Sequence, residues 1–286
     1  EEKEYFMLPE IKFKRSNKYG EKYKNDRYIR MDVWLKFLGL YLSEGCCKNS
    51  LKRPYNYLIS ITQKKEQNLL EIESVLNELG YKWYRDGIHY KIHDKQLYTY
   101  LSKYGKSYDK YIDDSIKNLS KRQLKILLKY LMMGDGTNIT YPKLNKSVNK
   151  IYHYTTNSYY TASKKLMNDV SEICIKCGYG ITVTTKKKIY NNITYNLYSI
   201  HLLGSKHFRI SPQNITIIEN FDDYVYCAVV PNSTMYVKRN GRCVWSGNSP
   251  RQISECYKQL GKAVNMETTQ SSFWGNLKKE VGRIVK

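Results

Sequence analysis

The stretches FLGLYLSEG (residues 37–45) and LKYLMMGDG (residues 128–136) decide how this chain folds. Each is an apolar run of helical character that ends in an acidic residue followed by glycine, a residue typical of helix ends. If the two helices pack side by side, Glu44 and Asp135 arrive at the same place at the protein surface. Two carboxylates at short range repel each other, and a divalent cation between them removes that repulsion. The pair therefore predicts a metal site formed by Glu44 and Asp135.

The segments around these two stretches repeat one order of elements. Each unit has a helix, a strand-like segment and an amphipathic helix that stops at a Gly-Tyr pair. These segments cover residues 31–43, 57–63 and 65–81 in the first unit and residues 120–133, 151–157 and 161–179 in the second. Alternating strand-like segments follow at 81–93 and 181–203. The repeat predicts a pseudo-two-fold α+β fold, with two sheets on one side of the helices.

At these residues the chain resembles the LAGLIDADG homing endonucleases, in which two such helices form the central interface and the acid before the final glycine binds the metal. The resemblance covers about residues 31–205, with units at about 31–105 and 110–205. It implies a monomeric saddle that binds double-stranded DNA with strands in the major groove, and cleavage with Mg²⁺ or Mn²⁺ held by Glu44 and Asp135.

The resemblance extends to the segment before the second motif. Lys110 matches a lysine that assists catalysis in intein-borne members of the family, and Ile112 matches the isoleucine that follows it. Asp113 replaces the proline expected next. Lys110 is therefore expected to stabilise developing charge or to orient the attacking water.

Composition favours a polyanionic partner. The chain has 48 Lys and Arg against 26 Asp and Glu, a net charge of +22, and 29 Tyr. An AT-rich genome is an alternative source of the same bias. We expect a group of residues in basic strands to contact DNA, although a solvated charge run is the competing interpretation for each: Lys52, Arg53, Lys186, Lys187, Lys188 and Tyr190.

Cysteine usage and hydropathy bear on the compartment. No apolar run approaches the roughly 20 residues of a membrane span, and no signal-peptide pattern opens the chain. The seven cysteines are odd in number and scattered, so we expect a cytoplasmic or nuclear protein that is not secreted. Cys174 and Cys177 form a lone CxxC, for which a core helix face is favoured over zinc.

Residues 224–249, YVYCAVVPNSTMYVKRNGRCVWSGNS, resemble the C-terminal splicing blocks of an intein, the C-terminal β part of a Hint domain. The side chain of Asn248 would cyclise and release the following segment, and Ser249 would accept the upstream one. Cys227 stands where inteins carry a residue that helps the branching steps. Gly247 and Ser233 stand where histidines are usual, and a β-hairpin that only resembles an intein end is the alternative.

The predicted domain order follows from both resemblances. It comprises a linker or residual splicing segment, the endonuclease, the C-terminal splicing segment and a host-protein extein, at residues 1–30, 31–205, 206–248 and 249–286. The extein faintly resembles a stretch of the second-largest subunit of RNA polymerases. N-terminal splicing blocks are expected on a separate intein half or on a longer gene product. A cleavage-inactive DNA-binding saddle and a splicing-only split-intein half are the alternative functions.

Overall fold

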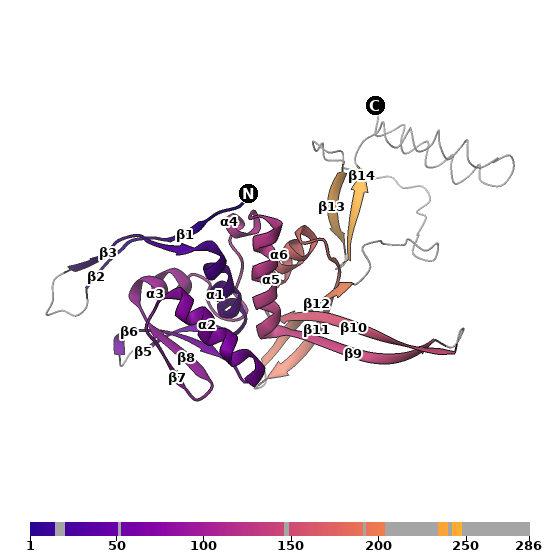
Figure 1. Ribbon diagram of the computed structural model, residues 1–286, viewed down its shortest axis with the longest axis horizontal. Helices are drawn as coiled ribbons and strands as arrows, with labels where there is room; N and C mark the ends of the chain where they lie inside the picture. The colour runs from indigo at the N-terminus through magenta and orange to yellow at the C-terminus, as the bar shows by residue number, and fades with distance from the viewer. Residues whose placement is uncertain are drawn as a thin grey trace, which may run out of the picture. The chain divides into compact units, whose positions relative to one another are not determined.

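A computed structural model describes residues 1–14, 21–50, 53–145, 149–190, 193–203, 234–239 and 242–247 (Figure 1). The chain divides into two compact units, Glu1–Lys206 and His207–Lys286. Five residues singled out in the sequence lie outside the described residues: Lys52, Cys227, Ser233, Asn248 and Ser249. Among the described helices, none is long and apolar enough to cross a bilayer.

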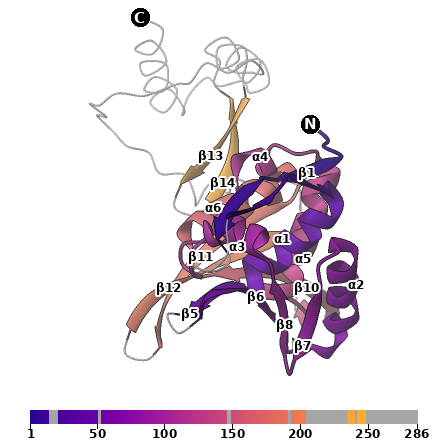
Figure 2. The ribbon, with the colours of Figure 1, turned by 90° about the vertical axis from the view of Figure 1, so that its left-hand side faces the viewer.

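Two helices, α1 (Met31–Glu44) and α5 (Lys121–Asp135), pack side by side at the centre of the first unit (Figures 1 and 2). A Cβ added to Gly39 would lie 2.8 Å from Tyr130 Cβ, and one added to Gly134 would lie 2.4 Å from Ser43 Cβ. Gly39 and Tyr130 are 91 residues apart, as are Ser43 and Gly134 and the two acids. Each of these contacts between the two helices, here called a packing layer, joins equivalent positions of the two repeats. In each layer a glycine of one helix faces a larger residue of the other. The predicted helix pair and the α+β class are confirmed.

Each repeat carries one four-stranded antiparallel group next to its central helix. In the first repeat the strand order is β5-β6-β8-β7, with bounds Gly45–Ser50, Arg53–Thr62, His89–His93 and Trp83–Asp86. In the second repeat β11 pairs with β12, β12 with β10 and β10 with β9, with bounds Gly180–Tyr190, Ile193–Leu203, Lys150–Thr161 and Gly136–Asn145. The second helices of the repeats are α2 (Leu69–Leu79), preceded by the 3₁₀ turn η1 (Glu66–Asn68), and α6 (Lys164–Lys176).

The helices cover one face of each sheet, as Figure 1 shows. Because neighbouring residues of a strand point to opposite faces, alternate residues are buried beneath the helices. In the first sheet these include Ile59, Ile61 and Ile92, and in the second Tyr159 and Ile200, each at most 2% exposed. No helix among the described residues lies on the opposite face of either sheet. Cys174 and Cys177 are buried at α6, as expected for a core helix face.

Residues before α1 form two antiparallel strand pairs that the sequence did not reveal. They are β1 with β4 and β2 with β3, with bounds Tyr5–Leu8, Arg27–Arg30, Ile11–Lys14 and Glu21–Lys24. The ring of Phe6 stacks on Trp34 of α1 with centroids 3.9 Å apart. The helix α3 (Lys95–Ser102), also unpredicted, holds this segment because the Gln96 amide donates to the carbonyls of Pro9 and Asn25.

The first residues of the chain also reach the start of α5. Lys3 N donates to Gln123 Oε1 over 3.1 Å. Arg122 forms ion pairs with Glu2 and with Asp32 in the first turn of α1. The N-terminal segment therefore ties together the starts of both central helices, at the end opposite Glu44 and Asp135. A short helix, α4 (Asp114–Lys117), precedes α5.

In the second compact unit, β13 (Thr234–Arg239) and β14 (Arg242–Gly247) pair antiparallel from Thr234 opposite Gly247 to Arg239 opposite Arg242. Two paired strands fit the splicing-block interpretation and the plain hairpin equally, so these strands leave both open.

Candidate metal and nucleic-acid site

The helices α1 and α5 pass directly into strands at the glycines that follow the acids. Gly45 has φ −93° and Gly136 has φ −94°, both extended. A Cβ on Gly45 would lie 2.6 Å from Tyr41 O, and one on Gly136 would lie 2.2 Å from Met132 O. Glycine is needed here because a side chain has no room, and not because the helix ends in a left-handed residue. The abrupt turn leaves Glu44 and Asp135 at the junction of helix and strand.

The two acids lie at neighbouring helix ends, as the motifs predict. The Cγ atom of Glu44 is 3.2 Å from the point where a Cβ on Gly134 would stand. Burial raises the pKa of Glu44, and burial together with the charge of Glu44 raises the pKa of Asp135 to about 7. Neither carboxylate has a hydrogen bond or ion pair to another described residue. Both carboxylates are therefore free to bind a cation, although Lys65 and Lys110 contribute positive charge nearby.

Lys110 is buried beside the acids and bound to the end of α1. Its Nζ donates to the carbonyls of Tyr41, Leu42 and Gly45 over 2.9, 2.9 and 2.8 Å. An ammonium group has three N–H donors, so these bonds use all of them. Burial lowers the pKa of Lys110 to about 8, against the opposing effect of Asp135. The lysine thus places positive charge beside the acids and fixes the last turn of α1.

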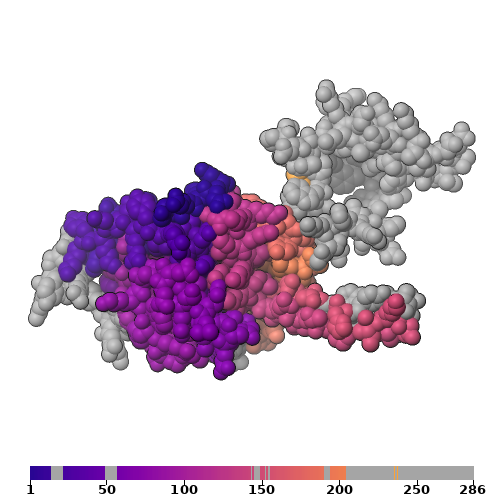
Figure 3. Space-filling model, viewed as in Figure 1, coloured from indigo at the N-terminus to yellow at the C-terminus, as the bar shows by residue number. Residues whose placement is uncertain are grey.

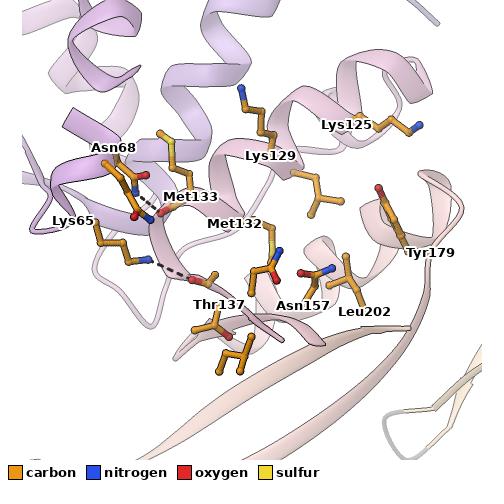
Figure 4. A pocket seen from close by; sticks show the side chains of 15 residues that line it. Lys65, Asn68, Lys125, Lys129, Met132, Met133, Thr137, Asn157, Tyr179 and Leu202 are labelled. Carbon is orange, nitrogen blue, oxygen red and sulfur yellow. Dashed lines mark hydrogen bonds between the residues drawn. The ribbon is translucent and has the colours of Figure 1, made fainter. Parts of the chain in front are cut away.

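The end of α5 is held in the same way by residues that the sequence did not single out. Lys65 Nζ donates to Gly134 O over 3.1 Å and to Gly136 O over 3.4 Å. Asn68 Nδ2 donates to Met133 O over 3.1 Å (Figure 4). Lys65 is exposed and retains one N–H donor. The available signal was the run Gln63-Lys64-Lys65, which begins at the last residue of the strand-like segment of the first repeat.

Two further polar groups near the start of this run have no partner in the described structure. They are Ser60 Oγ and Gln63 Nε2, both buried. Buried polar atoms are nearly always hydrogen-bonded, so these atoms fit a bound water or ligand oxygen.

The donor set suits a hard cation with few protein ligands. Within the described ranges, no cluster of three or more His, Cys, Asp or Glu side chains could hold a metal ion. Two carboxylates without a third ligand match Mg²⁺, which binds to one or two carboxylates and keeps water or phosphate oxygens in its other positions. Glu44 and Asp135 therefore fit such an ion.

The open faces of the sheets place some of the predicted DNA contacts together. By the strand register, Lys186 and Lys188 share the open face with His201, whereas Lys187 points to the opposite face. Arg53 begins β6 and Tyr190 ends β11. On the first sheet Lys91 lies on the open face, opposite Ser60.

Comparisons with known proteins give distant similarities, and no family model matches the chain. It is 27% identical over 230 residues to an ATP-dependent Clp protease proteolytic subunit of Chlamydomonas moewusii, covering 74% of this chain and 22% of the relative. It is 28% identical over 273 residues to a DNA-directed RNA polymerase subunit beta C-terminal section of Stigeoclonium helveticum, covering 78% of this chain and 24% of the relative. The chain thus spans about a quarter of the length of these curated relatives.

Two solved structures show weak likeness in three dimensions. The homing endonuclease I-WcaI bound to its DNA recognition sequence has a TM-score of 0.36 at 17% identity, covering 60% of this chain and 76% of that one. The LAGLIDADG meganuclease I-AabMI bound to uncleaved DNA has a TM-score of 0.33 at 13% identity, covering 59% and 78%.

Proposed function

We propose that this chain is a metal-dependent endonuclease of the LAGLIDADG type that cuts double-stranded DNA at a specific site. The observation that carries the proposal is the placement of Glu44 and Asp135 at the adjoining ends of two close-packed helices, each at the point where a strand begins. A protein that only binds DNA gains nothing from two half-buried carboxylates with raised pKa values that face a phosphate backbone.

The residues of the site take different roles in this proposal. Glu44 and Asp135 would hold Mg²⁺ or Mn²⁺, and the bound ion would polarise a phosphoryl oxygen and activate a water. Two of the three N–H donors of Lys65 hold its ammonium group at the end of α5. The third N–H is left to donate to the scissile phosphate. Lys110 acts as a positioning residue: its bonds to three carbonyls fix the last turn of α1 and therefore the direction of Glu44.

The open sheet faces would lie against the DNA. Lysines on these faces, including Lys91, Lys186 and Lys188, contact phosphates in a protein whose net charge is +22. With about eight phosphate contacts, affinity would fall on the order of a thousandfold or more between about 50 and 200 mM salt. An affinity for DNA that does not change with salt concentration would contradict the proposal that these lysines bind DNA.

Cleavage by purified chain tests the catalytic assignment. The substrate is a pool of duplexes with a randomised central window, incubated with Mg²⁺, with Mn²⁺ or with a chelator. Cleavage should need the metal, and Glu44→Gln and Asp135→Asn should each abolish it while leaving duplex binding within a few-fold. Glu66→Gln, at an acid of the 3₁₀ turn η1, is the matched control and should cleave normally. Full cleavage by either site variant contradicts the metal-ligand assignment, and binding without cleavage by the unaltered chain supports a cleavage-inactive binder.

We also propose that the module is carried within host proteins and that Asn248, Ser249 and Cys227 serve protein splicing. Supporting this, two relatives with unrelated names, a protease subunit and a polymerase subunit, each match about three quarters of the chain over about a quarter of their own length. A segment inserted into different hosts accounts for that pattern. The polymerase relative also agrees with an RNA polymerase subunit as the source of residues 249–286.

A further inference from the structure

The two repeats differ in the length of the strands that extend away from the acids. Gly45 lies opposite Ile61, which pairs with Tyr90. In the second repeat Gly136 lies opposite Tyr159, which pairs with Ile200. These registers make Tyr90 equivalent to Ile200. It follows that Asp86 and His89, the last pair of the β7–β8 hairpin, are equivalent to Thr184 and Ser199.

The hairpin of the second repeat continues well past that point. After Asp86 the first repeat turns back through Gly87, whose φ is +59°, and Ile88. The β11–β12 hairpin instead continues through residues 185–190 and 193–198, which form six more cross-strand pairs. At about 3.4 Å per residue this adds about 20 Å to the strands.

The other hairpin of the second repeat is also the longer one. Past its glycine, β9 runs from Gly136 to Asn145 and remains paired with β10 throughout. In the first repeat β5 ends at Ser50 and its register with β6 shifts between Lys48 and Ser50. Figure 3 shows the β9–β10 strands, in pink, projecting on the side away from the first repeat. Both hairpins of one repeat are thus extended, so the difference is not confined to one loop.

The extension carries side chains suited to a nucleic acid on its open face. Lys186 and Lys188 alternate on β11, and Tyr195 lies directly opposite Lys188. Both lysines are exposed, and Tyr195 is 39% exposed. Lys187 and Ile189 occupy the opposite face. Lysines at every second position, with a tyrosine beside them, provide phosphate contacts and a flat ring for a sugar or base on that face only.

We infer that the DNA site is read asymmetrically: the flank bound by the second repeat extends farther from the cut than the flank bound by the first, by up to about six base pairs. The figure follows from about 20 Å of additional strand and a rise of about 3.4 Å per base pair. This inference rests on the proposed endonuclease function, because it takes the open sheet faces as the DNA-binding surface and the two acids as the centre of the cut.

Selection of cleaved duplexes from a pool with a randomised window of about 40 base pairs tests the inference. Sequencing of cut products gives the position of the cut and the base preference at each position on both sides. The preferred positions should extend about four to six base pairs farther on one side. Equal extents on both sides would overturn the inference and leave the endonuclease function standing. Failure to bind or cut any duplex would overturn the endonuclease function itself.

Two variants assign the longer side to the second repeat. In the first, residues 185–198 are replaced by Gly-Ile, the two residues that join Asp86 to His89 in the first repeat. This variant should lose preferences only at the far end of the longer flank and should cut at the same position. Loss from the shorter flank, or no change, would overturn the assignment.

Point variants keep the test decisive if the shortened chain does not fold. The double variant Lys186→Ala with Lys188→Ala should reduce the slope of log affinity against log salt by about two and remove hydroxyl-radical protection at the outer end of the longer flank. Lys187→Ala, which removes a charge from the opposite face, should reduce the slope by less than about 0.5 and keep the protection. Equal effects of the two sets would overturn the proposal.

Discussion

Exchanging the two residues of one packing layer would test the pseudo-two-fold contact between α1 and α5. Gly134→Ser alone introduces a Cβ atom at position 134. Its ideal position is 2.4 Å from Ser43 Cβ and 3.2 Å from Glu44 Cγ. Carbon atoms in favourable contact are about 3.5–4.0 Å apart, so the helices must separate or bend. Adding Ser43→Gly removes the side-chain atoms of Ser43, which make the two shortest of these contacts. The exchanged pair then reproduces the layer with its two sides reversed.

The expected energies follow from the contacts of the layer. Overpacking by Gly134→Ser should lower the free energy of unfolding by about 2 kcal/mol. Ser43→Gly alone should cost about 1.5–2 kcal/mol, because it removes the hydrogen bond from Ser43 Oγ to Leu131 O and adds a glycine within a helix. In the double variant, the introduced serine faces Leu40 O, the carbonyl equivalent to Leu131 O, and the total loss should be about 1 kcal/mol. The coupling between the two substitutions is then about 3 kcal/mol.

Urea unfolding of the four proteins in this double-mutant cycle measures the coupling. A matched control combines Gly134→Ser with Ser74→Gly, which removes a serine and its hydrogen bond to Glu78 from the exposed side of α2. That pair should be additive within about 0.5 kcal/mol. Additivity of the Ser43 and Gly134 substitutions to the same degree would refute the equivalence of the two positions.

Three further predictions concern the site and the splicing residues. Lys110→Met should lower the free energy of unfolding by about 2–3 kcal/mol, because three carbonyls at the end of α1 lose their donor; an unchanged urea midpoint would contradict this role. The free energy of unfolding of metal-free protein should fall as pH rises from about 4 to about 7. The reason is that the pKa of Asp135 is about 7 in the folded chain, above its ordinary value of 3.8, so that between these two pH values the folded chain binds a proton that the unfolded chain does not. The full difference is on the order of 4 kcal/mol, and Asp135→Asn should remove it; parallel pH profiles of the two proteins would exclude this titration. Supplied with a cognate N-terminal intein half, the chain should release residues 249–286 and ligate them to the upstream segment. Asn248→Ala should block this release, and Ser249→Ala should allow at most cleavage. If mass spectrometry shows no loss of residues 249–286, the splicing proposal is wrong.

Local patterns located much of the fold. The four long helices have apolar residues at helical spacing, and two of them stop at Gly80 and Gly178, whose φ values of +72° and +90° only glycine adopts easily. The short helix α3 was missed because it depends on distant contacts: Leu97 and Leu101 are fully buried, and Gln96 bonds to residues more than 70 positions earlier.

The same distinction holds within the site. The two acids were predictable because each ends a recognisable motif. The position of Lys65 depends on carbonyls about 70 residues later in the chain, and no local pattern encodes that approach. The role of Lys110 as a helix-end ligand could likewise not be read from its neighbours. Its three bonds reach carbonyls 65 to 69 residues earlier.

The tie between Lys3 and Gln123 affects how the chain folds as it is made. The two residues are 120 positions apart, so at about 5–20 residues per second Lys3 leaves the ribosome about 6–24 s before its partner exists. Phe6 and Trp34 can stack early, since both belong to the first repeat. Glu2 and Lys3 must wait for α5, and the nascent first repeat meanwhile exposes the face of α1 that α5 later covers. A chaperone that binds nascent chains would find its target there, during the interval between the two repeats.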